Sequence, residues 1–237
     1  VSVFFILTFQ RNILWSDPIL IWKDTVAKSP YKARAYLNLG QSYLKKLDYE
    51  EALKAYKHAA QLDPLVPQAY MDVSEILYRQ HKMKEAFMYA DKAIEVEPSS
   101  YLPYIQKGVL LARDNKYQEA LEFFSKSLNI KSDQIETYKM RGMAYLLLKQ
   151  DSEALKDFDV YSSKRPMDTE VIKKKADIYF SKKDYQKALN EYNQLIHLDP
   201  LAPYFYNRSV LYEILGQKDL MDRLREEIVQ QWPGSVP

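Results

Sequence analysis

Cysteine is absent from this 237-residue chain, and glycine is scarce, with five residues. Without cysteine the chain has no disulfides, no thiolate chemistry and no cysteine-ligated zinc, although this is equally compatible with cytoplasm and periplasm. Charge of one sign is also lacking, because 34 basic and 32 acidic residues leave a formal net charge of +2. We therefore expect no nucleic-acid partner. The densest basic run, Lys173-Lys174-Lys175, is interleaved with acidic neighbours and is predicted to be a solvated helix face.

Side chains suited to catalysis or metal binding do not cluster in the sequence. The three histidines, His58, His81 and His197, fall at unrelated places in the pattern described below. The Asp157-Phe158-Asp159 triplet imitates the metal-binding Asp-x-Asp of sugar-nucleotide enzymes. Phe158 falls at a core position of that pattern, however, so both aspartates are expected at a solvated helix edge. We predict no catalytic residue, no cofactor, no metal site and no enzymatic activity.

What the sequence does contain is a repeat. Six prolines, at 30, 64, 98, 166, 200 and 233, are separated by 34, 34, 68, 34 and 33 residues, and one slot is skipped at Ser132. With proline at position 32 of each repeat, positions 4 and 11 are large and position 20 is alanine in five repeats. Position 8 holds Gly40, Ser74, Gly108, Gly142, Ala176 and Ser209, and position 24 holds Tyr56, Ala90, Phe124, Phe158 and Tyr192.

This spacing predicts two amphipathic helices in each repeat, because positions 4, 8 and 11 share one helix face and positions 20, 24 and 27 share another. A glycine inside a helix costs about 1 kcal/mol relative to alanine. Glycine at position 8 therefore indicates close approach of the partner helix, and we expect the small residue of position 20 at that crossing. The predicted helix pairs cover residues 33–64, 67–98, 101–132, 135–166, 169–200 and 202–233.

The period and its aromatic, small and proline positions resemble the tetratricopeptide repeat. The resemblance covers residues 33–233, with five strong repeats and a degraded sixth in which Met221 replaces the expected alanine. It implies an all-α fold, a right-handed superhelical solenoid of about six repeats, followed by a tail at 234–237. Such a solenoid would act as a protein–protein interaction scaffold that holds a peptide or helix in its concave groove.

The groove is expected to be lined by first-helix positions 2, 5, 6, 9, 12 and 13 of the repeats. In the middle repeats these positions are unusually apolar, and methionine can adapt to different partners. The predicted partner-binding residues are Met71, Tyr78, Leu102, Ile105, Val109, Met140, Met143, Leu146 and Leu147. Packing between adjacent first helices is the alternative explanation. Binding of chaperone C-termini is not expected, because the corresponding clamp positions hold Leu37, Gln41, Asp72, Leu102 and Gln106.

The N-terminal region precedes the repeats. Residues 1–12 begin with a nine-residue apolar run, too short for the roughly 20 residues of a membrane-spanning helix, and we predict that it ends such a helix. A hydrophobic strand or helix tucked against the cap is the alternative, and a signal-peptide remnant is disfavoured because no basic start and no small-residue cleavage site accompany the run. Residues 13–32, with Asp17 and Pro18 at a helix start, are predicted to form a capping half-repeat.

The junction at Phe9-Gln10-Arg11-Asn12, with Trp15 and Trp22, resembles that of bacterial multispanning membrane proteins with C-terminal tetratricopeptide repeats, a type related to glycosyltransferases. The resemblance implies a membrane-anchored chain with its repeats in the periplasm, and a cytoplasmic location is the alternative. It also offers a second function, an accessory domain of a membrane glycosyltransferase whose catalytic part is absent from this chain.

Overall fold

The structure is a computed structural model that describes residues 17–199 and 202–231. Within these ranges every regular element is an α-helix, and no strand occurs. In chain order the helices are α2 (Pro18–Lys28), α3 (Ala33–Lys45), α4 (Tyr49–Leu62), α5 (Pro67–Arg79), α6 (Met83–Val96), α7 (Tyr101–Arg113), α8 (Tyr117–Ile130), α9 (Ile135–Leu147), α10 (Asp151–Ser162), α11 (Thr169–Ser181), α12 (Tyr185–Leu198), α13 (Ala202–Ile214) and α14 (Lys218–Gln231). The predicted all-α class is confirmed.

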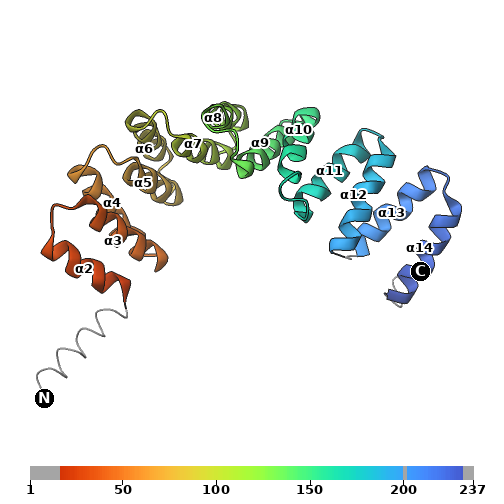
Figure 1. The fold of residues 1–237 in the computed structure, drawn as a ribbon, viewed down its shortest axis with the longest axis horizontal. Coiled ribbons are helices and arrows are strands. Elements are labelled where there is room, and N and C mark those ends of the chain that lie inside the picture. The colour runs from red at the N-terminus through yellow and green to blue at the C-terminus, as the bar shows by residue number, and fades with distance from the viewer. Residues whose placement is uncertain (1–16, 200–201, 232–237) are drawn as a thin grey trace, which may run out of the picture. The chain divides into compact units, whose positions relative to one another are not determined.

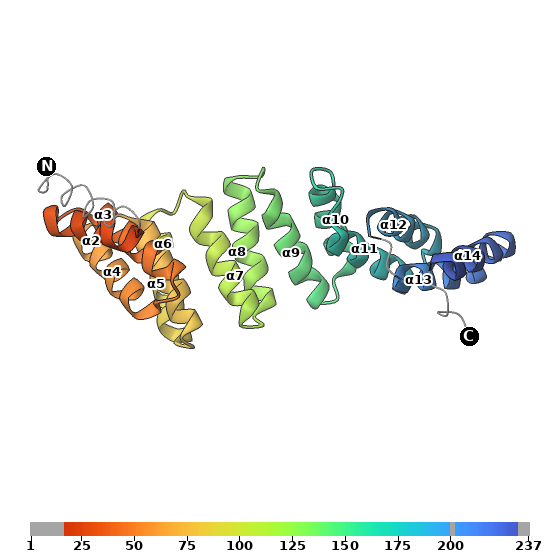
Figure 2. The ribbon, with the colours of Figure 1, turned by 90° about the horizontal axis from the view of Figure 1, so that it is seen from below.

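The chain divides into two compact units, residues 1–132 and 133–237, and the boundary follows Ser132, where the proline spacing skips a slot. Consecutive helices are the main packing partners within each unit (Figures 1 and 2). They form the hairpins α3–α4, α5–α6 and α7–α8 in the first unit, and α9–α10, α11–α12 and α13–α14 in the second. Each hairpin corresponds to one repeat of the sequence, and α2 packs against α3.

Three of the described helices, α2, α4 and α11, begin with an aspartate side-chain cap. The Asp17 carboxylate accepts a hydrogen bond from the Ile19 amide at 2.9 Å, and Pro18 occupies the first turn of α2, where no amide donor is needed. Asp48 caps α4 in the same way through the Glu51 amide at 3.2 Å. These caps satisfy amides that have no partner within their own helix.

The turn inside every hairpin contains one residue with left-handed backbone. These residues recur with the repeat and have φ between 58° and 69°: Leu47, His81, Asn115, Lys149, Lys183 and Gly216. The amide that follows each one returns to the end of the preceding helix, as the Asp48 amide does to the Tyr43 carbonyl at 3.0 Å. This closure satisfies a terminal helix carbonyl, and glycine is the residue best suited to it. Only the last of the six turns has glycine.

The core of each hairpin lies between its two helices. The position-20 alanines, Ala52, Ala86, Ala120, Ala154 and Ala188, are completely buried. The large position-24 rings are buried as well, and Tyr56, Phe124 and Phe158 are among the largest fully buried side chains. Ile19, Trp22 and Val26 of α2 pack, partly buried, against the core that contains Tyr43 and Tyr56. The end of this core in the first unit is thereby covered.

The prediction that the position-8 glycines lie against the small residue of position 20 was wrong. A Cβ on Gly40 would lie 2.8 Å from Tyr56 Cε1, and one on Gly108 would lie 2.7 Å from Phe124 Cε1. Gly142 has the same relation to Phe158, at 2.7 Å. The glycine therefore makes room for the aromatic ring of position 24, not for the alanine of position 20.

The second repeat has a different pair at these positions. Its position 24 is Ala90, which is 1% exposed, and its position 8 is Ser74, whose hydroxyl donates to the Ala86 carbonyl at 2.7 Å. In this repeat, α6 thus has the small Ala90 in place of an aromatic ring, and α5 has Ser74, which is larger than glycine. In the first four hairpins the side chain at position 8 is therefore smallest where the one at position 24 is an aromatic ring.

Candidate functional site

The groove face is defined here as the first-helix face that carries repeat positions 2, 5, 6, 9, 12 and 13. In the first unit, Leu102 on α7 is the most open of the predicted binding residues, with 46% of its surface exposed. Met71, Ile105 and Val109 are half-buried. Tyr78 packs partly buried against the core of the first hairpins, and Arg113 lies over its ring at 5.8 Å. Leu102 is therefore the predicted residue most available to a partner in this unit.

In the second unit the predicted residues fall into two groups. Leu147 and Met140 on α9 are 56% and 37% exposed. Met143 and Leu146 are half-buried against the core that contains Phe158. Packing between helices thus occupies part of this predicted surface and leaves the rest open.

Polar contacts frame the apolar side chains of the first unit. Gln106 donates from Nε2 to the Met71 carbonyl at 2.5 Å, which joins α7 to α5. Glu75 forms an ion pair with Arg79 of its own helix at 2.8 Å and another with Arg113 of α7 at 2.9 Å. Burial raises the pKa of Asp72 to about 6, although a hydrogen bond from Gln68 acts in the opposite direction. In the first unit, the apolar side chains of the groove face therefore lie among polar side chains that are already paired with one another.

A cavity of about 450 Å³ lies in the second unit and was missed by the sequence analysis. It is lined by Asp177, Phe180, Tyr192, Tyr206, Asn207 and Val210. Except for Tyr192, these residues occupy groove positions 5, 6, 9 and 12 of the last two repeats. The same position rule would have found them. The predicted groove residues are apolar and come from the middle repeats, whereas this lining lies in the last two repeats and combines aromatic rings with a carboxylate and an amide.

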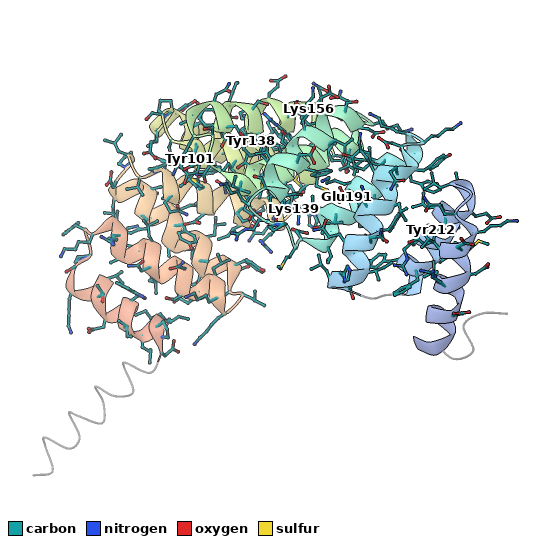
Figure 3. The ribbon with its side chains drawn as sticks, turned by 45° about the vertical axis from the view of Figure 1, so that its right-hand side comes forward. Tyr101, Tyr138, Lys139, Lys156, Glu191 and Tyr212 are labelled. Atoms are coloured by element: carbon teal, nitrogen blue, oxygen red, sulfur yellow. The ribbon has the colours of Figure 1, made fainter. Side chains whose placement is uncertain are left out.

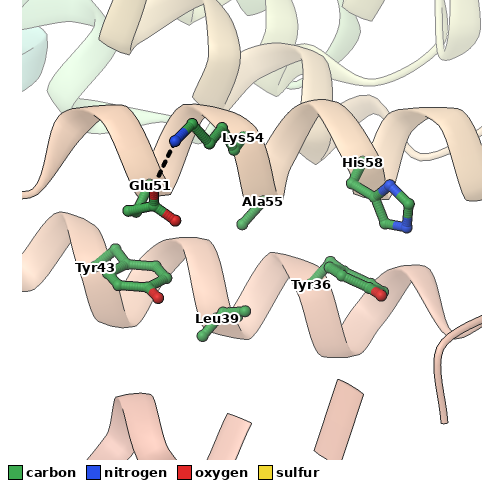
Figure 4. A pocket seen from close by; sticks show the side chains of 7 residues that line it. All are labelled: Tyr36, Leu39, Tyr43, Glu51, Lys54, Ala55 and His58. Atoms are coloured by element: carbon green, nitrogen blue, oxygen red, sulfur yellow. Dashed lines mark hydrogen bonds and ion pairs between the residues drawn. The ribbon is translucent and has the colours of Figure 1, made fainter. Parts of the chain in front are cut away.

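A second cavity, of about 300 Å³, lies between α3 and α4 in the first unit. Figure 4 shows Tyr36, Leu39 and Tyr43 along α3 facing Glu51, Ala55 and His58 of α4. The ring centroids of Tyr36 and His58 are 4.3 Å apart, and Lys54 is paired with Glu51 at 2.5 Å. Leu39 and Ala55 fall at positions 7 and 23, where the fourth repeat holds an arginine and an aspartate.

The arginine and aspartate of the fourth repeat, Arg141 and Asp157, form a buried salt bridge. The contacts in this region correct two expectations, one about Asp157 and one about the lysine run. Asp157 is 4% exposed and receives two hydrogen bonds from Arg141, both at 2.7 Å, so it does not lie at a solvated edge. Asp159 is exposed, as expected, and pairs with Lys175 at 2.9 Å. Lys175 also pairs with Glu191 at 2.9 Å and its side chain is 12% exposed, so the lysine run is not a uniform solvated face.

Figure 3 labels Tyr138 and Lys139 on α9 and Glu191 on α12, all within the second unit. Lys139 pairs with Asp168 at 2.9 Å and with Glu170 at 2.6 Å. In the described part of the chain, no group of three or more histidine, cysteine or acidic side chains could hold a metal ion. Asp157 and Asp168 in the second unit are instead paired with Arg141 and Lys139 of the chain itself.

Comparison with known proteins identifies the repeats. Residues 33–64, 103–134 and 174–200 match sequence profiles of the tetratricopeptide repeat. Tetratricopeptide repeats are therefore present at these positions of the chain. A comparison with curated protein sequences gave no match.

Solved structures of tetratricopeptide-repeat proteins have the same fold at low sequence identity. PilF of Pseudomonas aeruginosa superposes with a TM-score of 0.66 at 18% identity over 86% of this chain and 93% of PilF. YrrB, described as having an unusual peptide-binding site, gives 0.63 at 20% identity over 77% of this chain and 94% of YrrB. MamA of Desulfovibrio magneticus RS-1 gives 0.64 at 20% identity over 71% and 95% of the two chains. At this identity the likeness establishes the tetratricopeptide solenoid fold.

The comparisons concern the repeats and not the N-terminal junction. Residues 1–12 and the tail at 234–237 lie outside the described residues, so the predicted anchor remains a prediction. Among the helices that are described, none is both long enough and apolar enough to span a bilayer.

Proposed function

We propose that this tetratricopeptide-repeat chain is a non-catalytic scaffold that holds a peptide or helix of a partner protein against its groove face. The observation that carries the proposal is the exposure of Leu102, Met140 and Leu147 on first helices, where three large apolar side chains remain open. Burying a leucine side chain is worth about 1.5–3 kcal/mol. An apolar partner segment that covered Leu102 in the first unit, or Met140 and Leu147 in the second, would supply that burial. YrrB, a protein of similar fold, is described as having a peptide-binding site, which supports the same role.

The test begins with peptides selected against the purified chain from a random library displayed on phage. Leu102→Glu should weaken binding of the selected peptides by about fivefold or more, because burying the exposed half of Leu102 is worth about 1 kcal/mol and a covered carboxylate also loses its hydration. Leu65→Glu is the matched control. Leu65 is also an exposed leucine, at 77%, but it lies in the turn between α4 and α5.

Circular dichroism should show unchanged helicity in both variants, because both side chains are exposed. Equal affinity of the two variants would exclude the groove face of the first unit as the binding surface. Failure to select any peptide would count against the scaffold function itself. A parallel Leu147→Glu variant examines the second unit, where Leu147 is the most exposed of the predicted residues.

We further propose that residues 1–9 tether the repeats to a membrane, with the repeats on the periplasmic side. The support is the apolar run at Val1–Phe9 followed by Arg11 and Trp15, residue types that favour a membrane interface. Fractionation of the full-length protein tests the tether. Extraction should require detergent, and release by salt alone would contradict it. The accessory glycosyltransferase role draws no support from the described helices.

A further inference from the structure

The 450 Å³ cavity of the second unit is lined by aromatic rings together with a carboxylate. Phe180 on α11 and Tyr206 on α13 are 38% and 67% exposed, so two aromatic rings stand open beside it. Asp177 lies one turn before Phe180 and is also exposed. The Tyr192 hydroxyl donates to Asp177 Oδ1 at 3.0 Å and thereby holds the carboxylate at the cavity. The site therefore offers one oriented negative charge between aromatic surfaces.

No ion pair joins Asp177 to a lysine or arginine in the residues that the structure describes. Its nearest cations along α11 are Lys173 and Lys174, about one turn earlier. On α13 the cation is Arg208, which lies over the rings of Phe205 and Tyr212 at 5.0 and 6.0 Å. The acids near the site are Glu191, paired with Lys175, and the exposed Glu213. Asp177 is thus left with a hydroxyl partner and without a bound cation.

The chain itself shows what such a set of groups can hold. Arg141 is bound bidentately by Asp157 and lies 5.6 and 5.9 Å from the ring centroids of Tyr138 and Tyr145. A carboxylate and two aromatic faces are the elements that surround this guanidinium. Cations are attracted to aromatic faces within about 6 Å, and this attraction adds to the ion pair. The cavity beside Asp177 has the same elements.

We propose that this cavity receives a lysine or arginine side chain of the bound peptide. The cationic head would pair with Asp177, and its aliphatic stem would lie against Val210 and the rings of Phe180 and Tyr206, as long cationic side chains do on apolar surfaces. This inference rests on the proposed scaffold function and adds to it a requirement for one basic residue in the partner. Lys173 and Lys174 oppose the incoming charge, so the gain is moderate.

The experiment uses the highest-affinity peptide selected by phage display against the full chain. Each lysine or arginine of that peptide is replaced in turn by norleucine, which keeps the aliphatic stem and removes the charge. At one position the replacement should weaken binding by about threefold to tenfold, in the range of an exposed ion pair with a cation–π contact. The same norleucine replacement in the peptide should not change its affinity for the Asp177→Asn protein. Asparagine at this position keeps an oxygen that accepts the Tyr192 hydrogen bond.

Glu122→Gln, which neutralises an exposed carboxylate on α8, is the control and should behave as the unmodified protein. Selected peptides without a basic residue would overturn the inference. So would a norleucine effect of equal size in the unmodified protein and in Asp177→Asn. In both of these cases Leu147→Glu, in the same unit as the cavity, would still weaken binding, and the scaffold function would stand. If no peptide is selected, the scaffold function and this inference fall together.

Discussion

The contact between Gly108 and the Phe124 ring makes a quantitative prediction about stability. Replacing Gly108 by alanine would normally stabilise a helix by about 1 kcal/mol. Here the new methyl carbon would lie 2.7, 2.8 and 3.2 Å from three atoms of a ring that is 1% exposed. Because the ring has little room to move, we take an overpacking cost of about 2 kcal/mol from the usual range of 1–3 kcal/mol. The expected net effect is a loss of about 1 kcal/mol.

The assay is denaturant unfolding of a double-mutant cycle that combines Gly108→Ala with Phe124→Leu. The smaller side chain removes the clash, so the double variant should be more stable than the sum of the single effects by up to about 2 kcal/mol, the overpacking cost. Ala112→Gly on the same helix gives an upper value for the propensity term, because Ala112 is half-buried and its methyl group is lost as well. Tetratricopeptide arrays can unfold in parts, so the transitions are followed by both circular dichroism and tyrosine fluorescence. If Gly108→Ala raises the free energy of unfolding by the full 1 kcal/mol or so of helix propensity, the Phe124 ring does not occupy the position that the structure gives it.

Two further predictions concern the turns and the pH dependence. His81→Gly should raise the free energy of unfolding by about 1 kcal/mol, because a non-glycine residue at φ 61° carries a cost of about 1–2 kcal/mol, and an unchanged denaturation midpoint would contradict this. Asp72→Asn should stabilise the protein at pH 7 by about 1–3 kcal/mol, because burial raises the pKa of Asp72 to about 6 from 3.8 and the folded state therefore disfavours the ionised form. The difference between the two proteins should shrink as pH falls from 6 towards 4, and a constant difference across that range would refute the assignment.

The helix hairpins could be predicted from the sequence because sterically demanding positions recur in every repeat. The partner of Gly108 could not, since period alone does not say whether position 20 or position 24 lies opposite position 8. Arg141 and Asp157 were hidden for another reason. Their positions hold leucine and alanine in the first repeat, so no period marks them. The left-handed turns were hidden because five of their six residues are not glycine.

The candidate site was predictable to a smaller extent. First-helix positions located the exposed Leu102 and Leu147, but the burial of Met143 and Leu146 depends on contacts with neighbouring helices. The cavity beside Asp177 mixes polar and aromatic residues, and a search for apolar stretches passes over it. Position in the repeat was a better guide to this site than hydrophobicity.

The complementary sizes of positions 8 and 24 in the first four hairpins bear on how such a chain can grow and be rearranged. Gly108 and Phe124 belong to one hairpin, and so do Ser74 and Ala90. Duplication of a whole hairpin copies a compatible pair, whereas a crossover inside a hairpin separates it. Joining α5 to α8 would set Ser74 against Phe124, and joining α7 to α6 would leave a void beside Gly108. The hairpin is therefore the segment that recombination, or a designer of chimeric arrays, can exchange intact.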